Sequence, residues 1–211
     1  THTTSSAASD VYKRQVLGRL DEAITSYKQA IELNPKFVQA HNNLGVTLQE
    51  YGKLDEAKES YKKAILLNPN YIEAHSNLGN TYKELGRLNE AINSYKHATK
   101  LNPHFAEAFS NLGVIFQEIG RLDEAKESYL KAINLKTDYE EAHYNLGVLL
   151  FRIRKYSSAA KHFEQCKTHQ SKLYAIQCSY LIDEETEFYK KFDLLVSQGE
   201  TNAVLGSLGF R

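Results

Sequence analysis

A repeat of 34 residues constrains this sequence more than any other feature. The prolines Pro35, Pro69 and Pro103 are separated by that step. The same step relates further columns of identical or similar residues: Gly45, Gly79, Gly113 and Gly147; Asn43, Asn77, Asn111 and Asn145; Ala57, Ala91, Ala125 and Ala159; Tyr61, Tyr95, Tyr129 and Phe163. So many columns keeping one period without an insertion indicate a tandem array, in which each unit packs mainly on its neighbours.

Each repeat contains two stretches with apolar residues at helical spacing. In residues 38–71 the two stripes are Ala40, His41, Leu44, Gly45 and Leu48, then Leu54, Ala57, Tyr61, Ala64, Ile65 and Leu67. Gly52 stands between them, where a left-handed residue ends a helix. Pro69 stops the second helix, because proline cannot continue the backbone hydrogen bonds. Gly45 and Ala57 are small where the two helices approach closely, and Tyr61 is the bulky residue between them.

These columns resemble the tetratricopeptide repeat, a family of 34-residue helix–turn–helix units. Counting Val38 as position 1, the matches are His41, Leu44, Gly45, Leu48, Ala57, Tyr61, Ala64 and Pro69. The departures are histidine or phenylalanine where the family prefers tryptophan (His41, His75, Phe109 and His143), and Thr137 in place of the fourth proline. The resemblance covers about residues 16–167. It implies an all-α fold, a right-handed α-α superhelix of stacked helix pairs.

The repeat pattern also divides the chain. Residues 1–15 do not fit the register, and we interpret them as a linker or a foreign scar, with a poorly formed first helix as the alternative. A partial repeat at 16–37 precedes full repeats at 38–71, 72–105 and 106–139, and a degenerate one at 140–173. In the degenerate repeat Arg154, Tyr156 and Cys166 replace glycine, leucine and alanine. Residues 174–211 are expected to form capping helices, with amphipathic stretches at 172–182 and 183–198.

Composition narrows the function classes. The sequence has 26 lysine and arginine residues and 26 aspartate and glutamate residues, so its formal net charge is zero. This argues against nonspecific binding to nucleic acid or anionic membranes. The cysteines, Cys166 and Cys178, cannot form a disulfide framework and favour a reducing compartment, the cytoplasm. The sequence has no methionine, and its last residues, 208–211, include the apolar Leu208 and Phe210 and no polar run. From this we expect a fragment whose natural protein continues beyond Arg211.

Candidate catalytic and metal sites are weak. The histidine column suits core packing better than metal binding, because neighbouring repeats lie about 10 Å apart. His162, Cys166 and His169, at spacings of four and three, are expected on one face of one helix; we interpret Cys166 as a buried thiol rather than a zinc ligand. No glycine-rich phosphate loop is present. The sequence therefore predicts no cofactor, no metal and no enzyme in this segment.

The remaining candidate is the surface of the first helices, which in this family line the concave groove of the superhelix. The expected peptide-binding residues are Asn43, Asn77, Asn111, Asn145, Asn42, Asn80, Gln49, Lys83 and Gln117. The column of four asparagines resembles the asparagine ladder in the repeats of O-linked N-acetylglucosaminyltransferases. Its side-chain amides can donate hydrogen bonds to a peptide backbone and accept them from it. The alternative is that the asparagines tie helix to helix. The family's carboxylate clamp is disfavoured, because the column where it needs lysine reads Asn42, Ser76, Ser110 and Tyr144.

The sequence thus predicts a scaffold that binds an extended peptide or partner protein in the groove. An alternative is the recognition arm of a larger enzyme, a glycosyltransferase or another modifying enzyme, whose catalytic domain lies beyond Arg211. A third hypothesis is an assembly spacer without groove affinity. Partner identity and oligomeric state do not follow from the sequence.

Overall fold

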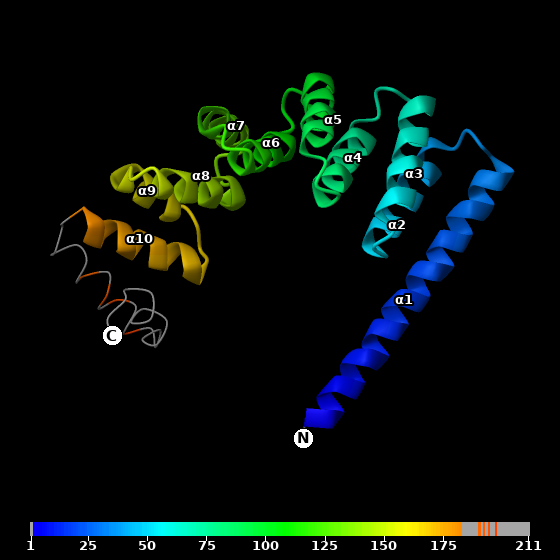
Figure 1. Ribbon diagram of the computed structural model, residues 1–211, viewed down its shortest axis with the longest axis horizontal. Coiled ribbons are helices and arrows are strands. Elements are labelled where there is room, and N and C mark those ends of the chain that lie inside the picture. Colours follow the sequence, from blue (N-terminus) through cyan, green and yellow to red (C-terminus); the bar gives the residue numbers. More distant parts are fainter. Residues whose placement is uncertain (1, 183–189, 191, 193, 195–196, 198–211) are drawn as a thin grey trace. The chain divides into compact units, whose positions relative to one another are not determined.

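The computed structural model describes residues 2–182 together with residues 190, 192, 194 and 197, and this part of the chain contains helices and connections but no strand. The helices shown in Figure 1 are α1 (His2–Leu33), α2 (Val38–Glu50), α3 (Leu54–Leu67), α4 (Ile72–Glu84), α5 (Leu88–Leu101), α6 (Ala106–Glu118), α7 (Leu122–Leu135), α8 (Glu140–Arg152), α9 (Tyr156–Phe163) and α10 (His169–Leu181). The all-α class predicted from the sequence is confirmed.

The helices form two compact units, Thr1–Pro103 with α1–α5 and His104–Arg211 with α6–α10. In the first unit α2 packs on α3 and α4 on α5, and the two pairs meet through α3 with α4 and α2 with α4. The second unit repeats this arrangement with α6–α7 and α8–α9. Each repeat is therefore a helix pair, and the first helices of neighbouring repeats lie beside each other within a unit.

A glycine against an aromatic ring holds each helix pair together. A Cβ atom added to Gly79 would lie 2.8 Å from Tyr95 Cε1, and one added to Gly45 would lie 2.6 Å from Tyr61 Cε1. The second unit has the same contact between Gly113 and Tyr129 and between Gly147 and Phe163. These aromatic side chains are at most 1% exposed. The prediction that the glycine column allows close approach to the aromatic residue is confirmed.

Left-handed residues connect the two helices of each pair. Gly52, Gly86 and Gly120 have φ of 84°, 71° and 78°, as expected for residues that end a helix. In the degenerate repeat Arg154 takes the same place with φ 60°. Non-glycine residues are disfavoured there because Cβ crowds the backbone. The turn is thus kept in the last repeat at a cost in backbone strain.

Replacing Arg154 by glycine should relieve this strain and stabilise the second unit. We expect a gain of about 0.5–1 kcal/mol, since the removed strain of about 1–2 kcal/mol is partly offset by the greater flexibility of glycine when unfolded. Urea unfolding measures the change. Lys161→Gly in helix α9 is the matched control, and it should destabilise by about 1 kcal/mol. A loss of stability in Arg154→Gly would contradict the account of this turn.

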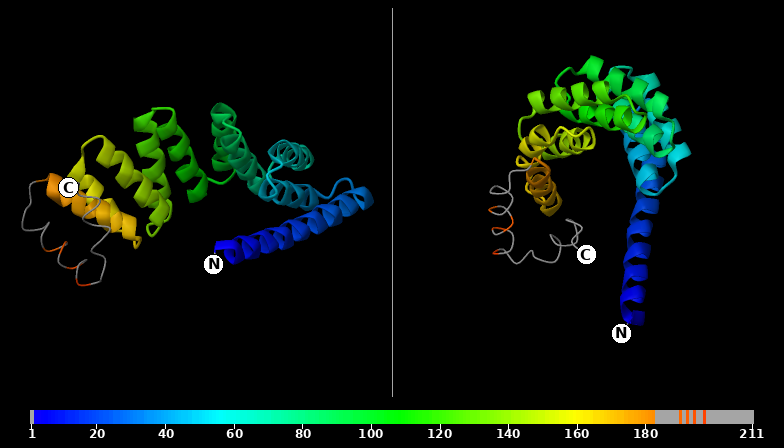
Figure 2. Two further views of the ribbon diagram at one scale, coloured as in Figure 1. Left: turned by 60° about the horizontal axis from the view of Figure 1, so that its bottom comes forward. Right: turned by 60° about the vertical axis from the view of Figure 1, so that its left-hand side comes forward.

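Helix α1 differs from the expected N-terminal arrangement. Residues 2–15, interpreted as a linker or scar outside the repeats, continue helically into the second helix of the partial repeat. Gly18 stands in the column of Gly52 and Gly86, but here the helix runs through it without a turn. Figure 2 shows the N-terminal half of α1 extending beyond the other helices of its unit. Among the described residues, the helix that packs on α1 is α2.

The last repeat ends earlier than the others. Helix α9 has 8 residues, whereas α3, α5 and α7 have 14 each. The Thr168 side chain accepts a hydrogen bond from the Ser171 backbone N–H and caps α10. Tyr174 of α10 stacks on Phe163 with ring centroids 4.9 Å apart. The helix expected at 172–182 thus starts at His169 and covers α9. The one expected at 183–198 lies outside the described residues, apart from four positions.

Candidate functional site

Two pockets occupy equivalent places in the two units, each between the first helices of neighbouring repeats. The pocket between α2 and α4, with a volume of about 330 Å³, is lined by Val46, Gln49, Glu50, Tyr61, Asn77, Asn80 and Glu84. The pocket between α6 and α8, of about 280 Å³, is lined by Val114, Gln117, Glu118, Tyr129, Asn145 and Arg152. Six of the residues in the first list are exactly two repeats from a residue in the second. Five of the nine predicted groove residues line one pocket or the other.

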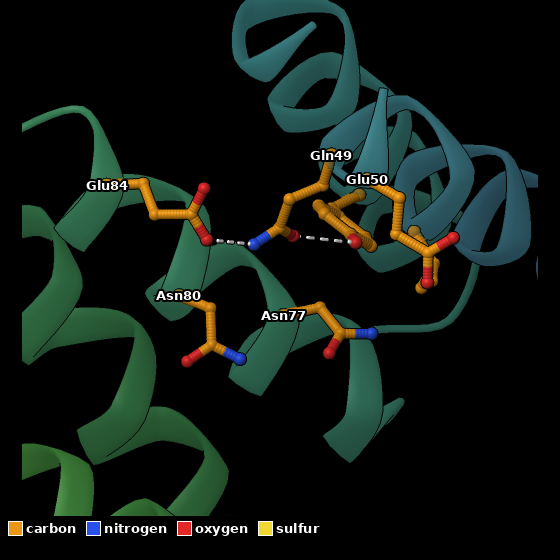
Figure 3. Close-up of a pocket in the computed structure, with 7 residues that line it drawn as sticks. Gln49, Glu50, Asn77, Asn80 and Glu84 are labelled. Carbon is orange, nitrogen blue, oxygen red and sulfur yellow. Dashed lines mark hydrogen bonds between the residues drawn. The ribbon is translucent and has the colours of Figure 1, made fainter. Parts of the chain in front are cut away.

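Gln49 joins three helices at the first pocket (Figure 3). Its side-chain oxygen accepts a hydrogen bond from the Tyr61 hydroxyl of α3 at 3.1 Å, and the Thr81 hydroxyl of α4 lies at the same distance. Its Nε2 group donates to Glu84 at 2.5 Å, as Figure 3 shows. The structure therefore places this predicted groove residue in a network that ties one repeat to the next.

In three repeats the hydroxyl group of the buried tyrosine donates a hydrogen bond to a side chain of the first helix. Tyr129 donates to Gln117 at 3.2 Å, the counterpart of the bond between Tyr61 and Gln49. In the middle repeat that column holds Lys83, which has no acceptor, and Tyr95 donates to Asn80 instead. In the last repeat, both partners are phenylalanines: Phe151 and Phe163. The pair of Gln49 with Tyr61 lines the first pocket, and the pair of Gln117 with Tyr129 lines the second.

The four ladder asparagines are not equally accessible. Asn43 is exposed, Asn77 and Asn145 are half-buried, and Asn111 is 9% exposed. The Nδ2 group of Asn77 donates to Asn42 Oδ1 at 3.2 Å, and Asn42 donates to Asn43 at 3.3 Å. The bond between Asn77 and Asn42 links α4 to α2, as expected for asparagines that tie helix to helix. A primary amide has two N–H donors and an acceptor oxygen, so one such bond does not exhaust its capacity.

The two pockets differ in charge. Two carboxylates, Glu50 and Glu84, flank the first, whereas Glu118 and Arg152 flank the second. Burial, with a smaller contribution from nearby carboxylates, raises the pKa of Tyr61 and Tyr129 well above the ordinary value of 10.0. Both hydroxyls therefore remain protonated donors at neutral pH. Lys83 lies in the last turn of α4, half-buried, and does not line the first pocket.

The histidine column has a packing role in each repeat that carries it. His41, His75 and His143 are 7–9% exposed, and their Nε2 atoms lie 2.9–3.0 Å from the backbone oxygens of Pro35, Pro69 and Thr137. Since a backbone oxygen only accepts, Nε2 carries the proton and donates. The expected burial of these histidines is confirmed. Thr137 provides the same backbone oxygen as proline, so its substitution leaves this contact intact.

The prediction that His162, Cys166 and His169 share one helix face is wrong. Helix α9 ends at Phe163 and α10 begins at His169, so the three residues fall on two helices and a turn. Cys166 is 7% exposed, and its thiol lies 3.4 Å from the backbone oxygen of Glu140. Its interpretation as a buried thiol is confirmed. Within the described part of the chain, no three His, Cys, Asp or Glu side chains gather closely enough to hold a metal ion.

A pair of histidines joins α8 and α9 in the second unit. His143 Nδ1 and His162 Nδ1 are 3.0 Å apart. Because Nε2 of His143 donates to a backbone oxygen, its Nδ1 is the acceptor and His162 is the donor. Burial, and then the proximity of His143, lowers the pKa of His162 below 6.5. The folded state therefore disfavours a proton that the unfolded state readily binds.

Stability of the second unit should consequently fall as pH drops below about 6.5, where the unfolded state begins to bind this proton. Above that pH both states are neutral at His162 and its contribution does not change. Urea unfolding between about pH 7.5 and 5.5 measures the effect. The variant His162→Gln cannot titrate and keeps a donor for His143, so its stability should depend less on pH. An unchanged pH dependence would show that the pair does not control it.

Comparison with known proteins identifies the fold family. The sequence matches the family profile described as TPR repeat four times, at residues 17–52, 50–86, 79–120 and 115–153. The chain belongs to the tetratricopeptide-repeat (TPR) family. It has the all-α TPR solenoid fold expected from the sequence, and TPR arrays serve as scaffolds for protein interaction. A search of curated proteins finds none that matches this chain.

Several solved structures share the fold of this chain. MamA matches with a TM-score of 0.66 and 26% identity over 83% of this chain and 95% of its own. PilF of Pseudomonas aeruginosa has a TM-score of 0.75 at 21% identity, and the match covers 96% of this chain and 97% of PilF. YrrB, described as a TPR protein with an unusual peptide-binding site, has a TM-score of 0.68 at 20% identity. The match covers 86% of this chain and 95% of YrrB. These structures agree with the TPR solenoid fold, and the comparisons do not show a particular resemblance to glycosyltransferase repeats.

None of the described helices combines the length and apolar character that crossing a membrane requires.

Proposed function

We propose that this TPR array binds an extended peptide segment of a partner protein along its first helices. The observation that carries the proposal is the recurrence of one pocket in both units, at columns two repeats apart. YrrB, which shares the fold, is described as having a peptide-binding site. This supports a binding role without identifying the guest.

The pocket chemistry favours contacts to the guest backbone. Asn77 and Asn80 in the first pocket, and Gln117 and Asn145 in the second, provide both N–H donors and acceptor oxygens. An extended guest repeats its backbone groups about every 6.5–7 Å. Neighbouring first helices are spaced about 10 Å apart, so successive amides meet the guest about every third residue. Binding of this kind tolerates many guest sequences.

The two pockets nevertheless select different guest side chains. Glu50 and Glu84 make the first pocket attractive to lysine or arginine, whereas the second balances Glu118 with Arg152. We place this binding in a reducing compartment, the cytoplasm, because Cys166 and Cys178 are buried and are not joined in a disulfide. No catalytic role is proposed for the pocket residues.

A peptide-display selection against the whole protein tests the proposal. The selected peptides should bind saturably, and backbone amide NMR shifts should concentrate in α2, α4, α6 and α8. Enrichment of lysine or arginine opposite the first pocket should disappear with Glu50→Gln and Glu84→Gln. Failure to select any peptide, or shifts confined to the second helices of the repeats, would favour the spacer hypothesis.

A further inference from the structure

A pocket of about 300 Å³ lies in the first unit between the second helices α3 and α5, over α4. It shares no residue with the two pockets between the first helices. Its volume is at the lower end of pockets that hold small ligands or single side chains. We call it the histidine pocket, and it is lined by Lys62, Ile65, His75, Leu78, Tyr82, Glu90, Asn93, Ser94 and His97.

His75 presents an unused hydrogen-bond acceptor in this pocket. Its Nε2 group donates to the backbone oxygen of Pro69 at 2.9 Å, so Nδ1 carries a lone pair. His97 stacks on the ring with centroids 5.5 Å apart, which covers a ring face but does not use a lone pair that lies in the ring plane. His75 is 9% exposed, and within the described part of the chain no donor bonds to its Nδ1. Because a buried acceptor without a partner is unfavourable, a ligand that donates to it is favoured.

The second unit shows which group satisfies this acceptor. His143 stands two repeats after His75, and its Nε2 group donates to the equivalent backbone oxygen at 3.0 Å. Its Nδ1 accepts from His162, 3.0 Å away. In the first unit the column of His162 holds Ser94, whose hydroxyl donates to a backbone oxygen of its own helix at 3.0 Å. The first unit therefore keeps the acceptor but lacks the imidazole that donates to it.

The walls of the histidine pocket suit a flat ring. Ile65 and Leu78 provide aliphatic surface, and Tyr82 and His97 provide aromatic rings. These two aromatic residues are specific to this repeat. The corresponding columns read Leu48 and Lys63 in the repeat before it, and Phe116 and Lys131 in the repeat after it.

The charged residues of the pocket are paired with residues that do not line it. Lys62 bonds to Glu59 at 3.2 Å, and Glu90 accepts from Arg87 at 2.8 Å. Their charges are thus largely balanced on the protein. The pocket consequently favours an uncharged ligand over a carboxylate or an ammonium group.

We propose that the histidine pocket binds the imidazole ring of a histidine from a partner protein, whose ring N–H donates to His75 Nδ1. The ring takes the place that His162 occupies in the second unit. Because so few atoms provide little binding free energy, the ring has to be carried by a segment that makes further contacts. The site uses second helices, so it does not depend on the peptide binding proposed for the first helices.

Two isomeric probes test the hydrogen bond: 4-methylimidazole, which is the histidine side chain, and N-methylimidazole, which has no ring N–H. Each is titrated into the whole protein at about pH 8.5, where His75 and both probes are neutral. We expect 4-methylimidazole to bind with a dissociation constant of about 1–10 mM and to shift the Nδ1 resonance of His75. N-methylimidazole should bind about three- to tenfold more weakly. Equal affinities, or no saturable shift at His75, would overturn the proposal.

The variant Ser94→His tests the place of the ring. Its new imidazole reproduces the pair of the second unit, so it should fill the pocket and abolish the shift caused by 4-methylimidazole. Ser94→Ala is the matched control, because it loses the same hydroxyl but leaves the pocket open and should bind the probe as the parent does. Undiminished binding to a folded Ser94→His variant would contradict the site, and the probe pair in the parent decides if that variant does not fold.

A peptide-display selection eluted with 4-methylimidazole tests the source of the ring. The eluted peptides should contain histidine, and replacing that histidine by phenylalanine, which has no N–H donor, should weaken binding at least about threefold. Elution of no histidine peptide would overturn the assignment to a partner protein. A dimer that 4-methylimidazole dissociates, seen by sedimentation of the protein alone, would overturn it as well, because the ring would then come from a second copy.

Discussion

Replacing Gly79 by leucine is expected to disrupt the pair of helices α4 and α5. The new side chain would begin 2.8 Å from the Tyr95 ring, in a site where that ring is completely buried. Overpacking of this kind costs about 1–3 kcal/mol, and we expect the upper end because neither helix can move without disturbing its neighbours. The loss should also weaken the pair formed by α2 and α3.

Gly18→Leu is the matched control for this substitution. It introduces the same side chain into a helix, but nothing lies within 4 Å of the Cβ position at Gly18. There, leucine should leave stability unchanged or improve it by up to about 1 kcal/mol through its higher helix propensity. Thermal melts and hydrogen exchange measure both variants. The double variant Gly79→Leu with Tyr95→Ala should recover part of the stability that Gly79→Leu loses. If the effects of the two substitutions on stability simply add, the contact between the two residues is contradicted.

The second large effect is expected in binding. Changing Asn43, Asn77, Asn111 and Asn145 together to alanine should lower the affinity for selected peptides by about 100-fold or more, because each lost hydrogen bond costs about 0.5–1.5 kcal/mol. A single change should be barely visible. Some stability should also be lost, since Asn77 bonds to Asn42 within the protein. The helical content should remain that of the parent.

The sequence could predict the helix pairs because their packing depends on one repeated local rule. Glycine, alanine and an aromatic residue at fixed spacing specify the close approach between helices, and the contact of Gly45 with Tyr61 follows from it. The turn glycines were predictable for the same reason, since few other residues adopt positive φ. The match of Gly52 to its predicted position shows this directly.

Side-chain hydrogen bonds were less predictable, because a polar residue on a first helix can face a guest or a neighbouring helix. The sequence predicts Gln49 in the groove, where it lines the first pocket, but not the bonds of its amide to Tyr61 and Glu84. A signal was present in the sequence: tyrosine pairs with glutamine in two repeats, whereas Phe163 pairs with Phe151. The helical spacing of His162 and Cys166 does not apply, because α9 ends at Phe163 and a new helix starts after Thr168.

The most direct test of the central claim is the affinity of display-selected peptides for the parent and for the quadruple asparagine variant, measured by calorimetry at one salt concentration. Circular dichroism first establishes that both proteins are equally helical. Gln29→Ala with Glu32→Ala, on exposed positions of α1, provides a control away from the first helices. The account predicts binding by the parent and the control, and at least about 100-fold weaker binding by the quadruple variant. Equal affinity for all three proteins would contradict it and leave the asparagines with a purely structural role.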